Sequence, residues 1–304
     1  MTTWTYISHK SLDPVEWDSQ LHGQPGSSIY MLSTYLDEIA PSWGYLQSDQ
    51  GVRFPICIQK KWGIRQIRQP LFSQHFSPIY PPNNSEFELS SLLKAISDLA
   101  PLADIQIDLP APISLPKGWK NHERITYRLP LPEKADQLQK AYSSHHRRIL
   151  KKNEDIQLGP SKNQEDFIQL LKTEMPTLTG LRAEQFEVVN RLVTWLSIKR
   201  RGQLFTATDG DQLLAACYIL HSGNRLLYQW AVSSASGKQR QAMHRLIDHV
   251  LCEYAGSGLE FDFEGSMLPG LQRFYAGFGA KPYLYMRLTH SKFPAFLNRL
   301  LHVG

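Results

Sequence analysis

The side chains best suited to chemistry are concentrated in one stretch near the C-terminal end, FDFEGSMLPGLQRFYAGFGAKPY (residues 261–283). Its first residues alternate apolar and acidic, so a strand here would carry Asp262 and Glu264 on one face. Crowding by a second carboxylate raises a carboxyl pKa, which suits Glu264 to act as a general base. Tyr275 follows on a short helix, and a phenol can donate a proton at neutral pH. Ordinary packing of Tyr275 and an ion pair between Glu264 and Arg273 are the alternative explanations.

A second candidate lies where the expected strand YQWAV (228–232) leads through SASGKQ (234–239) into a helix. Backbone N–H groups at a helix N-terminus bind phosphate, and Lys238 and Arg240 would add positive charge. The segment is not a P-loop, because the earlier glycine and the following Ser or Thr are missing. A flexible turn before an ordinary helix is the alternative. The expected ligand contacts here are Ala231, Val232, Gly237, Lys238, Gln239 and Arg240.

A third candidate is the basic run HHRRILKK (145–152), which places Arg147, Arg148 and Lys151 on adjacent helical turns. Such a run is usually a solvated face, and the alternative is a cleft for an acceptor that bears phosphate. The eleven histidines show no metal-ligand spacing, so we expect no metal site.

Hydrophobic periodicity predicts the elements that position these residues. Strands are expected at 51–59, 104–109, 124–129, 225–232, 259–263 and 283–288, with a hairpin over 203–220. Helices are expected at 33–40 (Ser33 as N-cap), 85–100, 133–153, 164–175, 183–200, 237–258, 269–277 and 291–301. Pro130 and Pro132 mark a break. The pattern predicts an α/β (α+β) protein with domains at 1–132 and 133–290, and a terminal helix within 291–304 that packs back on the first domain.

Composition excludes several classes of protein. The chain has 304 residues, 42% of them hydrophobic, and a net charge of +5, which suits a globular protein and an anionic ligand but is too weak to indicate DNA binding. Cys57, Cys217 and Cys252 are far apart, as in a reduced intracellular protein. No signal sequence is evident, and the longest apolar run, LLAACYIL (213–220), is too short to span a membrane. We therefore expect a cytoplasmic protein.

Two features resemble the GCN5-related N-acyltransferases. RFYAGFGA (273–280) is similar to their aliphatic-Tyr-x-x-x-Gly-Phe pattern, with Ala280 where phenylalanine is usual. From residue 164 the expected order is helix, helix, three strands, helix, strand, helix, strand, as in that fold. The resemblance implies that Tyr275 protonates a departing coenzyme A thiolate while Glu264 deprotonates an amine acceptor.

The same resemblance assigns the pyrophosphate of coenzyme A to residues 234–239. Ser234 and Gln239 depart there from the usual Gln/Arg-x-x-Gly-x-Gly/Ala pattern. The strand 228–232 would polarise the acyl carbonyl through its backbone amides.

The chain also resembles the Fem-type branch, which has two such domains in tandem. DFEG…FYAGFGAKP is similar to its DFGG…FK-x-GFG pattern, and RQPLFSQHFSPIY (68–80) to its Pro-Pro-Phe-Thr-Gln stretch. The basic helix 142–153 resembles the helix that opens the second domain, near the acceptor. Tyr275 stands where that branch has lysine.

The resemblance implies an acyltransferase that moves an acyl group from acyl-coenzyme A to an amine in a ternary complex. Acetyl-coenzyme A is the leading candidate for the donor. In this interpretation Tyr228 and Asp262 contact substrate. One alternative is an aminoacyltransferase that uses aminoacyl-tRNA on a cell-wall precursor. Another is a catalytically silent module that binds a nucleotide-linked or lipid-linked ligand.

Overall fold

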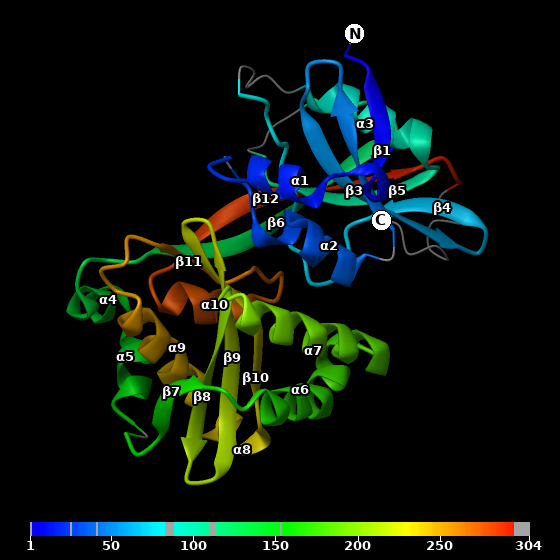
Figure 1. Cartoon of the computed structure of the whole chain (residues 1–304). Coiled ribbons are helices and arrows are strands. Elements are labelled where there is room, and N and C mark those ends of the chain that lie inside the picture. Colours follow the sequence, from blue (N-terminus) through cyan, green and yellow to red (C-terminus); the bar gives the residue numbers. More distant parts are fainter. Residues whose placement is uncertain are drawn as a thin grey trace. The chain divides into compact units, whose positions relative to one another are not determined.

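The computed structural model describes residues 2–24, 26–40, 42–82, 88–109, 114–152 and 154–294. The chain divides into two compact units (Figure 1). One, the N-terminal unit, comprises Met1–Arg124 with Leu284–Gly304, and the other, the C-terminal unit, comprises Ile125–Tyr283. The domain limits expected at 132 and 290 stay a prediction. None of the helices in these described ranges is long and apolar enough to cross a membrane.

The N-terminal unit is built on a sheet in the order β1-β2-β3-β4-β5-β12. Neighbouring strands are antiparallel except β4 and β5, which are parallel. The strands are β1 (Trp4–Ser8), β2 (Trp43–Ser48), β3 (Arg53–Lys61), β4 (Ile64–Arg68), β5 (Leu102–Ile107) and β12 (Lys281–Ser291). The helices are α1 (Pro14–Gln20), α2 (Ser33–Ile39) and α3 (Leu89–Leu99), with short 3₁₀ turns η1 (His9–Ser11) and η2 (Ile29–Met31).

Local signals explain the helix starts of this unit. Asp13 accepts a hydrogen bond from the Val15 N–H at 2.9 Å, so it caps α1 in front of Pro14. The prediction that Ser33 caps the next helix is wrong, because Ser33 is the first residue of α2. Its backbone N–H donates instead to the Asp18 carboxylate at 2.7 Å, so α2 receives its cap from a side chain of α1.

The C-terminal unit has a sheet in the order β7-β8-β9-β10-β11-β6. Here too all pairs are antiparallel except one, the parallel pair β10 and β11. The strands are β7 (Gln157–Ser161), β8 (Gly202–Asp209), β9 (Gln212–Ser222), β10 (Arg225–Ser233), β11 (Glu260–Asp262) and β6 (Trp119–Pro130), of which residues 125–130 belong to this unit. Strand β6 pairs with β11 through residues 128–130.

Helices cover both faces of this second sheet (Figure 1). Adjacent strand residues point to opposite faces. On one face Tyr218 stacks on Phe167 of α6, and its hydroxyl lies 2.8 Å from Ser197 Oγ in α7. On the other face Cys217 belongs to the hydrophobic core that also contains residues of α9 and α10. The helices are α4 (Ala135–Ala141), α5 (Ser144–Leu150), α6 (Gln164–Thr179), α7 (Ala183–Ile198), α8 (Ala235–Gln239), α9 (Ala242–Glu253) and α10 (Pro269–Gly277).

Most predicted elements are confirmed, but two long helices are interrupted. The helix expected over 133–153 breaks between α4 and α5, where the Ser143 N–H donates to the Gly277 carbonyl at 2.9 Å and Ser143 Oγ caps α5. The helix expected over 237–258 breaks at Gln241, whose φ is +52°. The elements α1, β1, β2, β4 and β7 were not predicted. The terminal helix expected over 291–301 falls mostly outside the described residues.

Candidate active site

The site begins where β10 and β11 separate. The two strands pair over three residues, and the last pair is Leu227 with Asp262. Strand β10 continues to Ser233 and carries a bulge at Gln229, because Tyr228 faces Ile219 while Trp230 faces the next residue, Tyr218. A bulge re-aims the backbone and side chains of a strand, and bulges are over-represented beside active sites.

A pocket of about 420 Å³ lies along this part of β10. Its walls come from four parts of the C-terminal unit: the end of α6, β10, the α8–α9 turn and α10. Its lining is mostly apolar and aromatic, as in pockets that hold small ligands. The lining residues are Glu174, Met175, Tyr228, Ala231, Val232, Ser233, Gly237, Lys238, Gln241, Met243, His244, Leu271, Phe274 and Tyr275.

Tyr275 is the best-placed proton donor in this pocket. Its side chain is 5% exposed and stacks on Phe263 with ring centroids 4.7 Å apart. Burial, and then the nearby carboxylate of Glu264, raise the pKa of Tyr275 well above its usual value. The phenol therefore keeps its proton at physiological pH, and burial also makes it a weaker acid than an exposed tyrosine, so its position in the pocket is what suits it to donate.

Tyr228 forms a second phenol in the pocket, with its ring 6.4 Å from that of Tyr275. Burial, with Cys217 and Tyr275 as smaller causes, also raises the pKa of Tyr228 well above its usual value. The two neutral phenols make the inner end of the pocket a hydrogen-bonding but uncharged surface.

Glu264 lies close to Tyr275 but is not among the residues that line the pocket. Its backbone is left-handed, with φ of +58°, and its N–H donates to Asp262 Oδ1 at 2.9 Å. This conformation is rare for a residue with a side chain and often marks functional positions. The role of Glu264 as general base for the amine stays a prediction.

Asp262 belongs to an ion-pair cluster, which we call the Asp262 triad. Its carboxylate is 0% exposed and accepts from Thr126 Oγ1 at 2.5 Å and from Arg128 Nε at 2.8 Å. Arg225 Nη1 lies 3.6 Å away. Asp262 does not line the pocket, since its carboxylate is enclosed by these three side chains and by the Glu264 N–H. A contact between Asp262 and substrate therefore stays a prediction.

The expected phosphate site at α8 is only partly formed. The Gly237 N–H donates to Ser234 Oγ at 3.1 Å, and the close approach of the Leu214 carbonyl explains why this position holds glycine. Lys238 pairs with Glu174 at 2.6 Å, and Arg240 pairs with Asp155 and Asp209 at 2.6 and 2.5 Å.

Gln239 is exposed, and neither it nor Arg240 lines the pocket. The residues present thus fit an apolar acyl arm along β10, but a pyrophosphate would have to displace acidic partners from both cations.

The basic side chains Arg147, Arg148 and Lys151 of α5 are not among the residues that line this pocket. Arg147 Nη1 donates to the carbonyl of Tyr142, the C-cap residue of α4, at 2.8 Å. Arg148 Nη2 lies 3.2 Å from His145 Nδ1. Lys151 is exposed at the end of α5. Binding of a phosphate-bearing acceptor by these residues stays a prediction.

Sequence reasoning missed His244 and Glu174. The His244 ring packs 4.8 Å from that of His146 and 4.7 Å from that of Phe274. Burial, followed by the neighbouring histidines, lowers the pKa of His244 to about 4, so its ring is neutral at pH 7. Periodicity could have found His244, since it shares the buried face of α9 with Ile247. No local signal points to Glu174.

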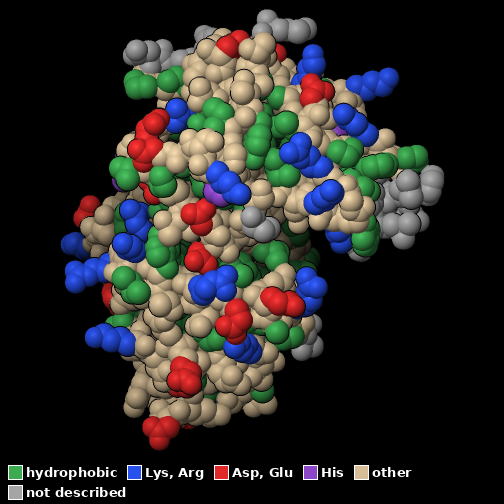
Figure 2. Space-filling view, turned by 45° about the vertical axis from the view of Figure 1, so that its right-hand side comes forward, with side chains coloured by type: hydrophobic (Ala, Val, Ile, Leu, Met, Phe, Trp, Pro, Cys, Tyr) green, Lys and Arg blue, Asp and Glu red, His purple; other side chains and the backbone are tan. Residues whose placement is uncertain are grey.

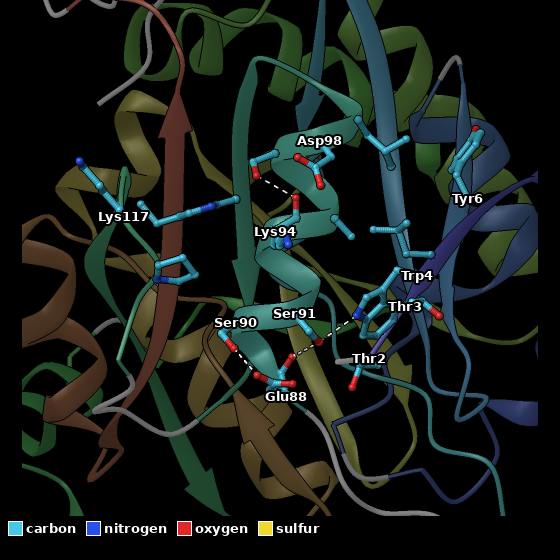
Figure 3. Close-up of a pocket in the computed structure, with 16 residues that line it drawn as sticks. Thr2, Thr3, Trp4, Tyr6, Glu88, Ser90, Ser91, Lys94, Asp98 and Lys117 are labelled. Carbon is cyan, nitrogen blue, oxygen red and sulfur yellow. Dashed lines mark hydrogen bonds between the residues drawn. The ribbon is translucent and has the colours of Figure 1, made fainter.

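Other parts of the structure offer less chemistry. Figure 3 shows the larger cavity of the N-terminal unit, about 720 Å³, where Trp4 Nε1 donates to Ser91 Oγ at 2.9 Å and Ser90 Oγ to Glu88 at 2.6 Å. These polar groups satisfy one another. In Figure 2 basic and acidic side chains are interspersed over the face in view. Within the described ranges, no group of three or more His, Cys, Asp or Glu is placed to hold a metal ion.

Comparisons with known proteins agree with this geometry. Residues 145–283 match the model of the acetyltransferase (GNAT) domain family. A search of curated protein sequences gave no significant match.

Three solved structures show the similarity in fold. One is FemX, with a TM-score of 0.65, 13% identity, and 98% of this chain and 99% of that chain covered. The second is a tandem GNAT protein from the clavulanic acid biosynthesis pathway, with a TM-score of 0.54, 12% identity, and 97% and 100% covered. The third is L-PGS from Bacillus licheniformis, with a TM-score of 0.53, 10% identity, and 95% of each chain covered. Residues 145–283 therefore match the acetyltransferase (GNAT) domain family, and the fold of the chain resembles that of FemX and of a tandem GNAT protein.

Proposed function

We propose that this chain is an N-acyltransferase that transfers an acyl group from acyl-coenzyme A to an amine in the pocket of the C-terminal unit. The observation that carries the proposal is Tyr275, a buried and protonated phenol in an apolar pocket beside the part of β10 that β11 leaves unpaired. The acyl arm would lie against Ala231 and Val232. Acetyl-coenzyme A is the first donor to test.

The reaction would proceed by direct attack of the amine nitrogen on the thioester carbonyl. Backbone N–H groups of residues 228–232 would stabilise the negative charge that develops on the carbonyl oxygen. As the C–N bond forms, Glu264, directly or through water, would take the proton of the amine. As the C–S bond breaks, Tyr275 would donate its phenolic proton to the departing sulfur, and a positioned acid of this kind contributes about 10²–10⁴-fold. The two proton transfers balance.

A second donor class, aminoacyl-tRNA, is favoured by one observation. Glu174 lines the pocket, and its carboxylate already binds a cation, the ammonium group of Lys238, at 2.6 Å. The free α-ammonium group of an aminoacyl donor would suit this carboxylate, whereas the phosphates of coenzyme A would be repelled by it. A cell-wall precursor would be the acceptor in that case, and a phosphate on it could contact Arg147, Arg148 or Lys151.

The test is a turnover assay in which the protein is given acetyl-coenzyme A and a panel of amines. The coenzyme A thiol that is released is then measured. We expect Tyr275→Phe to lower kcat by about 10²-fold or more, because only the proton donor is lost. Tyr254→Phe is the matched control, since Tyr254 is a tyrosine of the same unit that does not line the pocket. Its activity should equal that of the wild type.

Three other outcomes are informative. Wild-type activity in Tyr275→Phe would remove Tyr275 from the mechanism. Turnover with aminoacyl-tRNA but with no acyl-coenzyme A would establish the second donor class. Absence of turnover with both donors, together with ligand binding, would indicate the catalytically silent module.

A further inference from the structure

A polar pocket of about 310 Å³ lies on one face of the sheet in the N-terminal unit. The register places its side chains together: Arg68 on β4 is the partner of Asp104 on β5, and Gln66 is the partner of Gln59 on β3. Residues that are direct partners point to the same face of a sheet. Strand β12 adds Arg287 beside this pair. The residues that matter for its chemistry are Lys61, Gln66, Arg68, Gln69, Asp104 and Arg287.

The pocket carries more positive than negative charge. Arg287 holds Asp104 with two hydrogen bonds, Nε to Oδ1 at 2.8 Å and Nη2 to Oδ2 at 2.7 Å, and Arg68 Nη1 shares Oδ2 at 3.2 Å. Burial lowers the pKa of Arg68, Asp104 opposes this shift, and Arg287 adds to it by repulsion. Lys61 also lines the pocket, with its ammonium group over the Trp62 ring. The lining thus holds three cations and one carboxylate, an excess of two positive charges.

Gln66 supplies a buried donor that this arrangement leaves unused. Its side chain is 1% exposed, and its Oε1 accepts from Arg68 Nε at 3.0 Å. Among the described residues its Nε2 has no hydrogen-bond partner. Buried polar groups in folded proteins nearly always have partners, so an unpaired amide in the wall of a pocket indicates that a ligand completes it.

We propose that this pocket binds the phosphate group of a small phosphate monoester. A phosphate dianion balances the two excess positive charges, and its oxygens accept from guanidinium and amide groups in charge-assisted hydrogen bonds. The volume is at the low end for ligand sites, which suits a small molecule. All of these residues belong to the N-terminal unit, so this inference is independent of the proposed function.

The experiment is calorimetric titration of the full chain with inorganic phosphate and with glycerol 3-phosphate, and with acetate as a carboxylate probe. The diagnostic variant is Gln66→Leu, which removes the buried donor but keeps the size of the side chain. Gln74→Leu is the matched control, because Gln74 is also buried in this unit, also has an amide without a partner among the described residues, and lies outside the pocket. Lys61→Ala tests the exposed rim without disturbing the core.

We expect both phosphates to bind at one site per chain. Their affinity should be at least tenfold weaker in Gln66→Leu, a few-fold weaker in Lys61→Ala and unchanged in Gln74→Leu. Affinity should fall as salt is added. Absence of phosphate binding up to 10 mM would overturn the inference. So would equal affinity in Gln66→Leu and wild type, or binding of acetate as tight as that of phosphate.

Discussion

The two units contain the same arrangement of charges in different surroundings. In each unit an aspartate lies on the second strand of the parallel pair. One arginine that binds it comes from the first strand of that pair, and the other comes from the antiparallel strand on its opposite side. The clusters are Arg68–Asp104–Arg287 in the N-terminal unit and the Asp262 triad, Arg225–Asp262–Arg128, in the C-terminal unit.

The clusters differ in their exposure to solvent. The Asp262 carboxylate is 0% exposed, and Arg128 is covered by the Tyr283 ring at 3.3 Å. The Asp104 carboxylate is 13% exposed and opens into the polar pocket. The comparison teaches that one backbone arrangement serves two purposes. The buried Asp262 triad connects strands, whereas the Asp104 cluster, which reaches a pocket, can also bind a ligand. In the C-terminal unit the pocket lies farther along β10.

The largest expected effect comes from removing the central charge of the Asp262 triad, and the same change in the other cluster is its comparison. Asp262→Asn leaves two buried arginines without their counter-ion and should lower the free energy of unfolding by about 3–5 kcal/mol. Asp104→Asn should cost only about 1 kcal/mol, because solvent screens its partly exposed arginines. Urea unfolding of both variants measures the difference. Equal losses would contradict the distinction between a closed and an open cluster.

Gly237→Ala should have the next largest effect. An added Cβ atom would overlap the Leu214 carbonyl, which is backbone and cannot rotate away. We expect a loss of about 1–3 kcal/mol from the strain of overpacking. Gly159→Ala is the control, since no atom lies within 4 Å of its added Cβ, and it should be nearly neutral. Thermal unfolding compares the two variants, and equal melting temperatures would argue against a fixed wall at α8.

The pH dependence of stability should be a smaller effect than the loss of Asp262. The pKa of His244 falls from 6.5 to about 4 in the folded state, so between these values the unfolded chain binds more protons. Stability is therefore complete above pH 6.5 and is lost as pH falls towards 4, by on the order of 2 kcal/mol.

His244→Phe should reduce this loss, measured by urea unfolding at pH 7 and pH 4.5. His146, whose pKa burial also lowers, should retain part of it. The exposed residue His22 provides the control, His22→Asn. A pH dependence in His244→Phe as steep as that of the wild type would contradict the assignment.

Periodicity along the chain predicted the α/β fold and the order of elements after residue 164, because each of these elements buries one face. It missed β1, β2, β4 and β7, where the alternation of apolar and polar residues is weak. It also missed the breaks at Ser143 and Gln241. The first of these depends on a contact with Gly277, more than a hundred residues away in the sequence.

The site was predictable where residues follow one another on a strand and the turn after it. Tyr228, Ala231, Val232, Gly237, Lys238 and Tyr275, all expected to contact a ligand or substrate, line one pocket. The acidic partners of Lys238 and Arg240 could not be foreseen, because they come from α6, from the end of β8 and from the turn at Asp155. The buried environment of Asp262 is likewise set by strands β6 and β10.

The most direct test of the central claim, that the C-terminal pocket holds the acyl donor, is calorimetric titration with acetyl-coenzyme A. Wild-type protein and Gln66→Leu, altered only in the N-terminal unit, should bind with equal micromolar affinity. Ala231→Phe should abolish binding, because the larger ring would occupy the pocket beside β10. Absence of wild-type binding up to millimolar concentration, or unchanged binding in Ala231→Phe, would contradict the claim.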